Sequence, residues 1–79
     1  MMTMELDEFI KNFALQFDET DVSEFKAETI FKNVDEWSSL TALSVIAMVD
    51  DEYSVKITGE DIKAASTIED IYNTIQQKK

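Results

Sequence analysis

One stretch decides the fold of this chain: residues 38–53, which read SSLTALSVIAMVDDEY. It contains neither glycine nor proline and opens on two serines, which are suitable N-cap residues. The stretch therefore predicts a helix that begins at Ser38 or Ser39 and ends near Tyr53. At about 100° per residue, one face of this helix carries a predicted core stripe that consists of Ala42, Val45, Ile46, Val49 and Tyr53.

The opposite face of the same helix is also apolar. Leu40, Leu43 and Ala47 lie within about 60° of one another on it, and they are flanked by Ser44, Asp50 and Asp51. Such a helix is either buried on all sides or presents a small apolar patch with an acidic border to a partner protein. A chain of 79 residues has few places to bury a helix on both sides, so we favour the partner surface.

Two further helices are indicated on either side of this stretch. The segment of roughly residues 4–17 has helical periodicity in Leu6, Phe9, Ile10, Phe13, Ala14 and Phe17. The last helix should open on a capping box formed by Ser66 and Glu69. Its apolar stripe consists of Ile68, Ile71, Tyr72 and Ile75.

A short helix and a long connection complete the predicted fold. Thr58 and Asp61 have capping-box spacing and predict the short helix, while Asp21 and Glu24 predict a turn of helix within the connection. We expect the connection, residues 18–37, to be anchored by Val22, Phe25, Ile30, Phe31, Val34 and Trp37. The sequence thus predicts one all-α domain over residues 1–79, a small four-helix bundle of three main helices and a short third helix.

The composition argues against autonomous chemistry. Cysteine and histidine are both absent, which excludes disulfides, thiolate nucleophiles and the usual zinc ligands. Glu28, Asp35 and Glu36 have only the features of any acidic loop, and the acidic run at residues 50–52 lacks the alternating pattern of a calcium loop. We therefore expect no enzyme, no catalytic residues and no metal site.

The charge restricts the partners. Seventeen acidic and seven basic residues give a net charge of −10, which repels nucleic acids and anionic membranes and favours proteins with basic patches. The first residues lack the pattern of a secretion signal, and no run of about 18 apolar residues occurs. We therefore expect a soluble, cytoplasmic monomer that binds neither nucleic acid nor membranes.

The chain resembles the acyl carrier protein family. The resemblance lies in the step Ser39-Leu40 at the start of an apolar and acidic helix, in the acidic and aromatic end at residues 50–53, in the spacer at residues 55–57 and in the final helix from Ser66. It covers nearly the whole chain, is most specific between residues 37 and 75, and includes the length and the acidity. It implies the four-helix fold of that family.

The resemblance also implies a function. Ser39 matches the serine to which a phosphopantetheinyl transferase attaches 4'-phosphopantetheine from coenzyme A. The arm holds acyl groups as thioesters for fatty-acid, polyketide or related biosynthesis, so the chain is a substrate and not an enzyme. Partner enzymes, which are acyl-transfer and synthase enzymes with basic patches, would dock on Leu40, Leu43, Ala47, Asp50 and Asp51.

The chain departs from the family in three positions. Ser38 stands where the family usually has an aspartate, so a carboxylate that helps the modifying synthase is missing. Thr41 and Ser44 stand where acidic residues are common in the family.

The alternative function is an acidic helical interaction module with no prosthetic group, in which Ser38 and Ser39 only cap the helix.

An acyl chain is expected to enter between the second helix and the short third helix. Small and branched side chains leave shape there that a flexible chain can fill. The residues predicted to line this path are Val45, Ile46, Val49, Ile57, Ile62, Ala65 and Ile68.

Overall fold

The computed structural model describes the backbone of residues 2–79 and the side chains of residues 5–79. In this part of the chain no strand occurs, and the elements are α1 (Met2–Ala14), the one-turn 3-10 helices η1 (Val22–Glu24) and η2 (Phe31–Asn33), α2 (Ser39–Tyr53), α3 (Gly59–Ala64) and α4 (Ile68–Lys78). The predicted all-α bundle with a short third helix is confirmed. Among the described residues, none of the helices has the length and apolar character that crossing a membrane requires.

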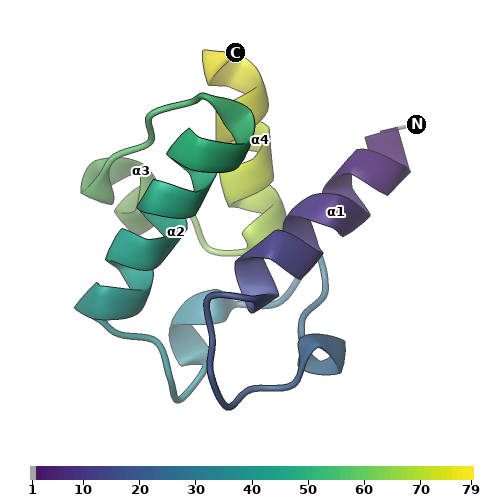
Figure 1. The fold of residues 1–79 in the computed structure, drawn as a ribbon, viewed down its shortest axis with the longest axis vertical. Coiled ribbons are helices and arrows are strands. Elements are labelled where there is room, and N and C mark those ends of the chain that lie inside the picture. Colours follow the sequence, from purple (N-terminus) through teal and green to yellow (C-terminus); the bar gives the residue numbers. More distant parts are fainter. Residues whose placement is uncertain (1) are drawn as a thin grey trace.

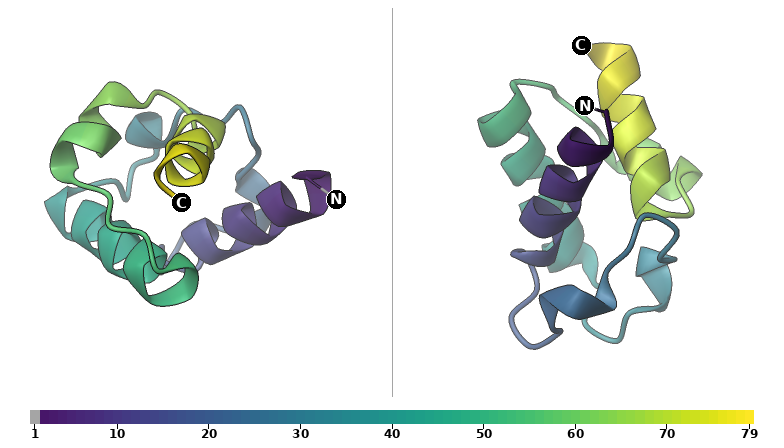
Figure 2. Two further views of the ribbon diagram at one scale, coloured as in Figure 1. Left: turned by 90° about the horizontal axis from the view of Figure 1, so that it is seen from above. Right: turned by 90° about the vertical axis from the view of Figure 1, so that its right-hand side faces the viewer.

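The helices pack around one hydrophobic core. α1 contacts both α2 and α4, and α3 joins α2 to α4 on the side away from α1 (Figures 1 and 2). The largest completely buried side chains are Phe9, Phe13, Phe31, Ile68, Ile71, Ile75, Val45 and Val49. Each such side chain stabilises the fold by about 1.5–3 kcal/mol relative to an exposed one.

α1 is shorter than its apolar stripe predicts. The stripe itself is confirmed, because Phe9, Phe13 and Phe17 are buried and the remaining members are buried or half-buried. The α-helix nevertheless ends at Ala14, since the N–H groups of Gln16 and Phe17 bond to carbonyls three residues back rather than four. This tighter turn keeps Phe17 against the core while the chain leaves the helix axis.

The connection between α1 and α2 runs along one end of the bundle (Figures 1 and 2). Phe25 and Phe31 are buried and Trp37 is half-buried, with the Trp37 ring 4.7 Å from the Phe31 ring between centroids. Each such aromatic pair contributes about 0.5–1.5 kcal/mol beyond the area that it buries. Val22 and Ile30 are 44% and 50% exposed, so the prediction that they anchor the connection is wrong.

The connection also contacts the start of α4 through its backbone. The Ile68 N–H donates to the Thr29 carbonyl at 3.2 Å, and the Glu69 N–H donates to the Ala27 carbonyl at 3.0 Å. The first N–H groups of a helix have no partner within the helix. Here the connection supplies those partners, so it is fixed to α4 by hydrogen bonds as well as by packing.

The predicted capping box at the start of α4 is wrong by one residue. Thr67, not Ser66, is the N-cap, and its hydroxyl accepts the N–H of Asp70 at 3.1 Å. The Asp70 carboxylate in turn accepts the N–H groups of Ser66 and Thr67 at 2.9 and 3.1 Å. The sequence offers two overlapping boxes, and this register gives Asp70 two backbone donors.

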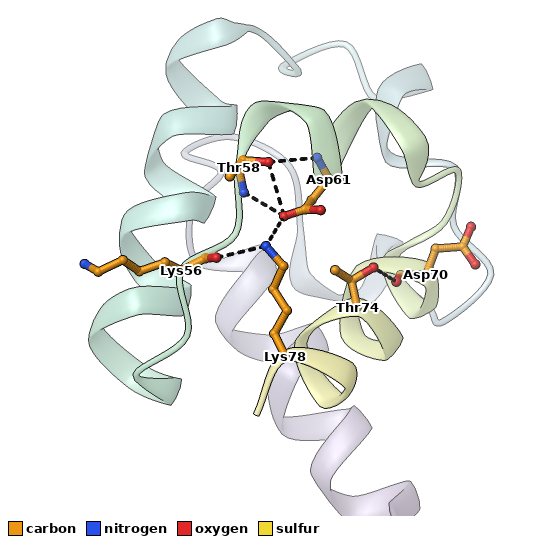
Figure 3. A network of polar contacts seen from close by, with 6 residues as sticks. All are labelled: Lys56, Thr58, Asp61, Asp70, Thr74 and Lys78. Atoms are coloured by element: carbon orange, nitrogen blue, oxygen red, sulfur yellow. Dashed lines mark hydrogen bonds and ion pairs between the residues drawn. The ribbon is translucent and has the colours of Figure 1, made fainter.

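The predicted box of Thr58 and Asp61 is confirmed at the start of α3. The ammonium group of Lys78, near the end of α4, lies 2.6 Å from the Asp61 carboxylate and 3.1 Å from the Lys56 carbonyl (Figure 3). The last turn of α4 therefore holds the first turn of α3.

Within the connection, the predicted turn after Asp21 is η1, where the Asp21 carboxylate accepts the N–H of Ser23.

α2 begins and ends close to the predicted residues. Ser38 is its N-cap, and the helix runs from Ser39 to Tyr53. Its C-cap is Ser54, whose φ of 56° and ψ of 37° lie in the left-handed region. Glycine is the usual residue in that conformation because it has no Cβ.

Candidate functional site

The start of α2 is held in place through the side chain of Ser38. Its hydroxyl accepts the N–H of Thr41 at 3.4 Å and lies 3.3 Å from the Thr41 hydroxyl. The Thr41 hydroxyl donates to the carbonyl of Glu36 at 3.0 Å, and Thr41 is buried. Ser38 is therefore engaged as a structural cap.

Ser39 is placed differently, although it is the next residue. It is the first residue of α2, its side chain is exposed, and in the described part of the chain its hydroxyl has no hydrogen-bond partner. The N–H groups of Ser39 and Leu40 belong to the helix end that attracts anions. The chain contains no histidine that could serve as a base for this hydroxyl.

A pocket of about 590 Å³ adjoins Ser39. Residues from α2, α3 and the end of the connection line it: Lys32, Trp37, Ser38, Ser39, Ala42, Leu43, Ile46, Gly59, Ile62 and Lys63. Its apolar members form most of the wall, and both charged members are lysines. No carboxylate is among these residues, although the chain as a whole carries a net charge of −10.

The pocket lies between α2 and α3, where the acyl chain is expected to enter, but most of its lining differs from the predicted set. Of the seven residues expected to line that path, Ile46 and Ile62 line the pocket. The other five are buried in the core: Val45, Val49, Ile57, Ala65 and Ile68. The space beside Ser39 is therefore nearer to the surface than the sequence suggested.

Only part of the predicted core stripe of α2 is completely buried. Val45 and Val49 are buried, whereas Ala42 and Ile46 are half-buried and face the pocket. Tyr53 is half-buried and packs against the core. The buried face also includes two residues that the stripe omits, Thr41 and Met48. Relative to the predicted stripe, the buried face of α2 is shifted toward Thr41 and Met48. This shift leaves Ala42 and Ile46 free to line the pocket.

The predicted apolar patch of α2 is confirmed as exposed surface. Leu40 and Leu43 are 77% and 61% exposed, and Ala47 is exposed as well. Asp50 and Asp51 are exposed further along the helix. The Asp50 carboxylate lies 3.2 Å from the Lys56 ammonium group, so Asp51 carries the less compensated charge of the two.

Of the three acidic residues considered in the connection, Glu36 has a clear structural role. The Glu36 carboxylate accepts the N–H groups of residues 18–20 at 2.7–3.1 Å. The hydrogen bond from the Thr20 hydroxyl is the main reason that the pKa of Glu36 is lowered. Glu28 and Asp35 are exposed. In the described residues no three acidic side chains are gathered as a metal ion would require.

Comparisons of the chain with models of protein families, with curated proteins and with solved structures find no match. The function therefore has to be inferred from the arrangement around Ser39.

Proposed function

We propose that this chain is an acyl carrier protein whose Ser39 carries a 4'-phosphopantetheine arm. One observation supports the proposal most directly, namely the different roles of two adjacent serines. Ser38 is engaged as the cap of α2, whereas Ser39 is exposed at the first position of the helix with an unengaged hydroxyl. A phosphodiester on Ser39 would lie at the end of α2 that favours negative charge.

The modification is a phosphoryl-group transfer from coenzyme A. The Ser39 oxygen attacks the phosphorus that bears pantetheine, a new phosphodiester bond forms, and the pyrophosphate bond breaks to release adenosine 3',5'-bisphosphate. The hydroxyl proton passes to a base of the transferase, because this chain has no histidine to accept it. The arm then supplies the thiol that a chain without cysteine lacks. In this proposal the chain is a substrate and has no catalytic residues.

The exposed face of α2 would be the docking surface of this carrier. Leu40 and Leu43 immediately follow the attachment point, so an enzyme that receives the arm has to contact them. Ala47 extends the apolar patch, and Asp50 and Asp51 would lie at its polar rim. The partners are then a phosphopantetheinyl transferase and acyl-transfer or synthase enzymes with basic patches.

Intact-mass measurement tests the proposal. The chain is incubated with coenzyme A and a broad-specificity phosphopantetheinyl transferase, and one phosphopantetheinyl group should be added. Ser39→Ala should abolish the increase. Ser38→Ala should still gain the group, although loss of the cap costs about 1 kcal/mol of stability. A gain of mass by Ser39→Ala would show that the attachment point is elsewhere.

An acidic interaction module without a prosthetic group is the second candidate. The observation that favours it is the serine cap itself, because Ser38 occupies the position of the carboxylate that helps modification in acyl carrier proteins. In this alternative the patch of Leu40, Leu43 and Ala47 binds its partner without an arm. The same measurement separates the two functions, since an interaction module would gain no mass.

A further inference from the structure

We propose that Lys32 and Lys63 bind the phosphate of the arm at the mouth of the pocket beside Ser39. The inference rests on the proposed function, because it needs a phosphodiester on Ser39. It adds a binding site for that phosphodiester, made by side chains from η2 and α3, which lie outside the helix that carries the attachment point.

Lys32, Lys63 and Ser39 all line the same pocket. The Lys32 ammonium group donates to the carbonyl of Lys63 at 2.8 Å, so the side chain of Lys32 already crosses from η2 to the end of α3. That contact uses one of its three N–H donors and leaves two for an anion. The four-carbon stem of Lys63 lets its ammonium group turn toward the same anion.

The charges of the chain support this site. The chain has far fewer basic residues than acidic ones, seven against seventeen. In the described residues the ion pairs are those of Lys56 with Asp50 and of Lys78 with Asp61. Lys32 and Lys63 have no carboxylate partner there, and no carboxylate lines the pocket. An anion at this pocket would therefore have two lysines within reach and no carboxylate among the lining residues.

The phosphate of the arm is the anion that fits this position. It is bonded directly to the Ser39 oxygen, so its charge has to lie beside the pocket whatever conformation the rest of the arm adopts. A charged group on the cargo, by contrast, would sit at the far end of a flexible arm and would need to fold back. Pairs of exposed charges attract only weakly in water, so the contact would favour one position of the arm without preventing its transfer to an enzyme.

The test uses the modified protein, with complete conversion verified by intact mass. In isotopically labelled protein, the NMR signals of the Lys32 and Lys63 ammonium groups should move when the apo form is converted to the holo form. Those of Lys26 and Lys56 should not. The phosphorus-31 signal of holo Lys32→Gln and Lys63→Gln should shift from that of the wild type, and most in the double variant. Added salt should reduce these differences.

Lys26→Gln is the matched control, because it removes the same charge from an exposed position of the connection that does not line the pocket. Lys63→Gln guards against a structural effect, since it leaves the contact between the Lys32 ammonium group and the Lys63 carbonyl possible. Complete conversion with unmoved lysine signals, or equal phosphorus-31 shifts in all variants including Lys26→Gln, would overturn the lysine site and leave the carrier function standing. Absence of any mass increase would overturn both.

Discussion

The hydroxyl of Thr20 lies 2.6 Å from a carboxylate oxygen of Glu36, which is 16 residues later in the chain. The same carboxylate accepts the N–H groups of Asp18, Glu19 and Thr20, while the carbonyl of Glu36 accepts the hydroxyl of Thr41. Glu36 thus joins the chain that leaves α1 to the first turn of α2. The position of Ser39 depends on this contact, because Ser39 follows in that same first turn.

Glu36→Gln should destabilise the fold at neutral pH, because the amide replaces one acceptor by an NH₂ group that faces backbone donors. The pKa of Glu36 is lowered from its ordinary value of 4.5, mainly by the Thr20 hydroxyl. A lowered carboxyl pKa contributes stability above the ordinary value, and this contribution is lost as the pH falls through the lowered pKa. The difference in Tm between wild type and Glu36→Gln should therefore be constant near neutrality and shrink below pH 4.5. Thermal unfolding across this range measures it.

Asp35→Asn is the control for this experiment. It removes the same charge from an exposed neighbour that has no hydrogen bond to the loop in the described residues. Its Tm should stay close to that of the wild type at neutral pH. If it fell as far as that of Glu36→Gln, net charge rather than the contact with Thr20 would account for the effect.

The ion pair of Lys78 and Asp61 should contribute less than the capping role of Asp61 does. The pKa of Asp61 is lowered first by the hydrogen bond from Lys78 and next by the N–H of Thr58. The side chains are 36% and 25% exposed, so Lys78→Met should cost at most about 1 kcal/mol. Asp61→Ala loses the capping box as well and should cost about 1–2 kcal/mol. Denaturant unfolding compares these variants with Lys11→Met, an exposed lysine of α1, and equal costs for all three would contradict the ranking.

Ser54→Gly should stabilise the protein. Ser54 has a φ of 56°, and a side chain in that conformation is strained. Glycine relieves the strain but loses more backbone entropy on folding, so the net gain should be about 0.5–1 kcal/mol. Ser44→Gly makes the same change inside α2, where it should cost about 0.5–1 kcal/mol. Denaturant midpoints at constant m-value would show the opposite signs, and a loss in both variants would mean that the C-cap of α2 is not strained.

Leu43→Asp should leave the fold intact and impair acyl transfer. Leu43 is 61% exposed, so the substitution should change stability by no more than about 0.5 kcal/mol. A partner that buries this position would meet an unpaired charge. Leu15→Asp is the matched control and should affect neither property, because Leu15 is 68% exposed and follows the last residue of α1. Circular dichroism and acyl-transfer kinetics measure the two effects, and lost helicity in Leu43→Asp would show that the leucine belongs to the core.

Much of the fold could be predicted because local rules agree with tertiary packing. α2 has an uninterrupted run with a serine at its start, and the stripes of α1 and α4 repeat at the helical period and are buried in the structure. The box of Thr58 and Asp61 was also unambiguous, since no second box overlaps it. In these segments one pattern of residues allowed one structure.

The remaining differences depend on contacts between distant segments. Two boxes overlap at the start of α4, and the choice of Thr67 depends on how α4 meets the connection. Thr41 is buried because the carbonyl of Glu36 accepts its hydroxyl, a partner that no periodicity of apolar residues reveals. The same holds for Glu36, which looks like any acid of a loop until residues 18–20 are folded against it.

The site was partly predictable. The exposure of Ser39, Leu40 and Leu43 follows from their angle on α2. The pocket could not be located in the same way, because its wall combines α2 with α3 and with Lys32 of η2. The sequence contains seven lysines, and nothing in it distinguishes Lys32 and Lys63 from the others or places them beside Ser39.

The bonds from the first turn of α4 to the connection have a consequence for hydrogen exchange. Amide protons at the start of a helix ordinarily exchange rapidly with solvent, whereas those of Ile68 and Glu69 are bonded to the carbonyls of Thr29 and Ala27. They can exchange only when the connection separates from α4, and that separation would disturb the packing of Phe25 and Phe31. We therefore expect these two amides to exchange more slowly than the first-turn amides of the other helices. Slow exchange at both positions would show that the longest irregular segment of the chain opens together with its last helix.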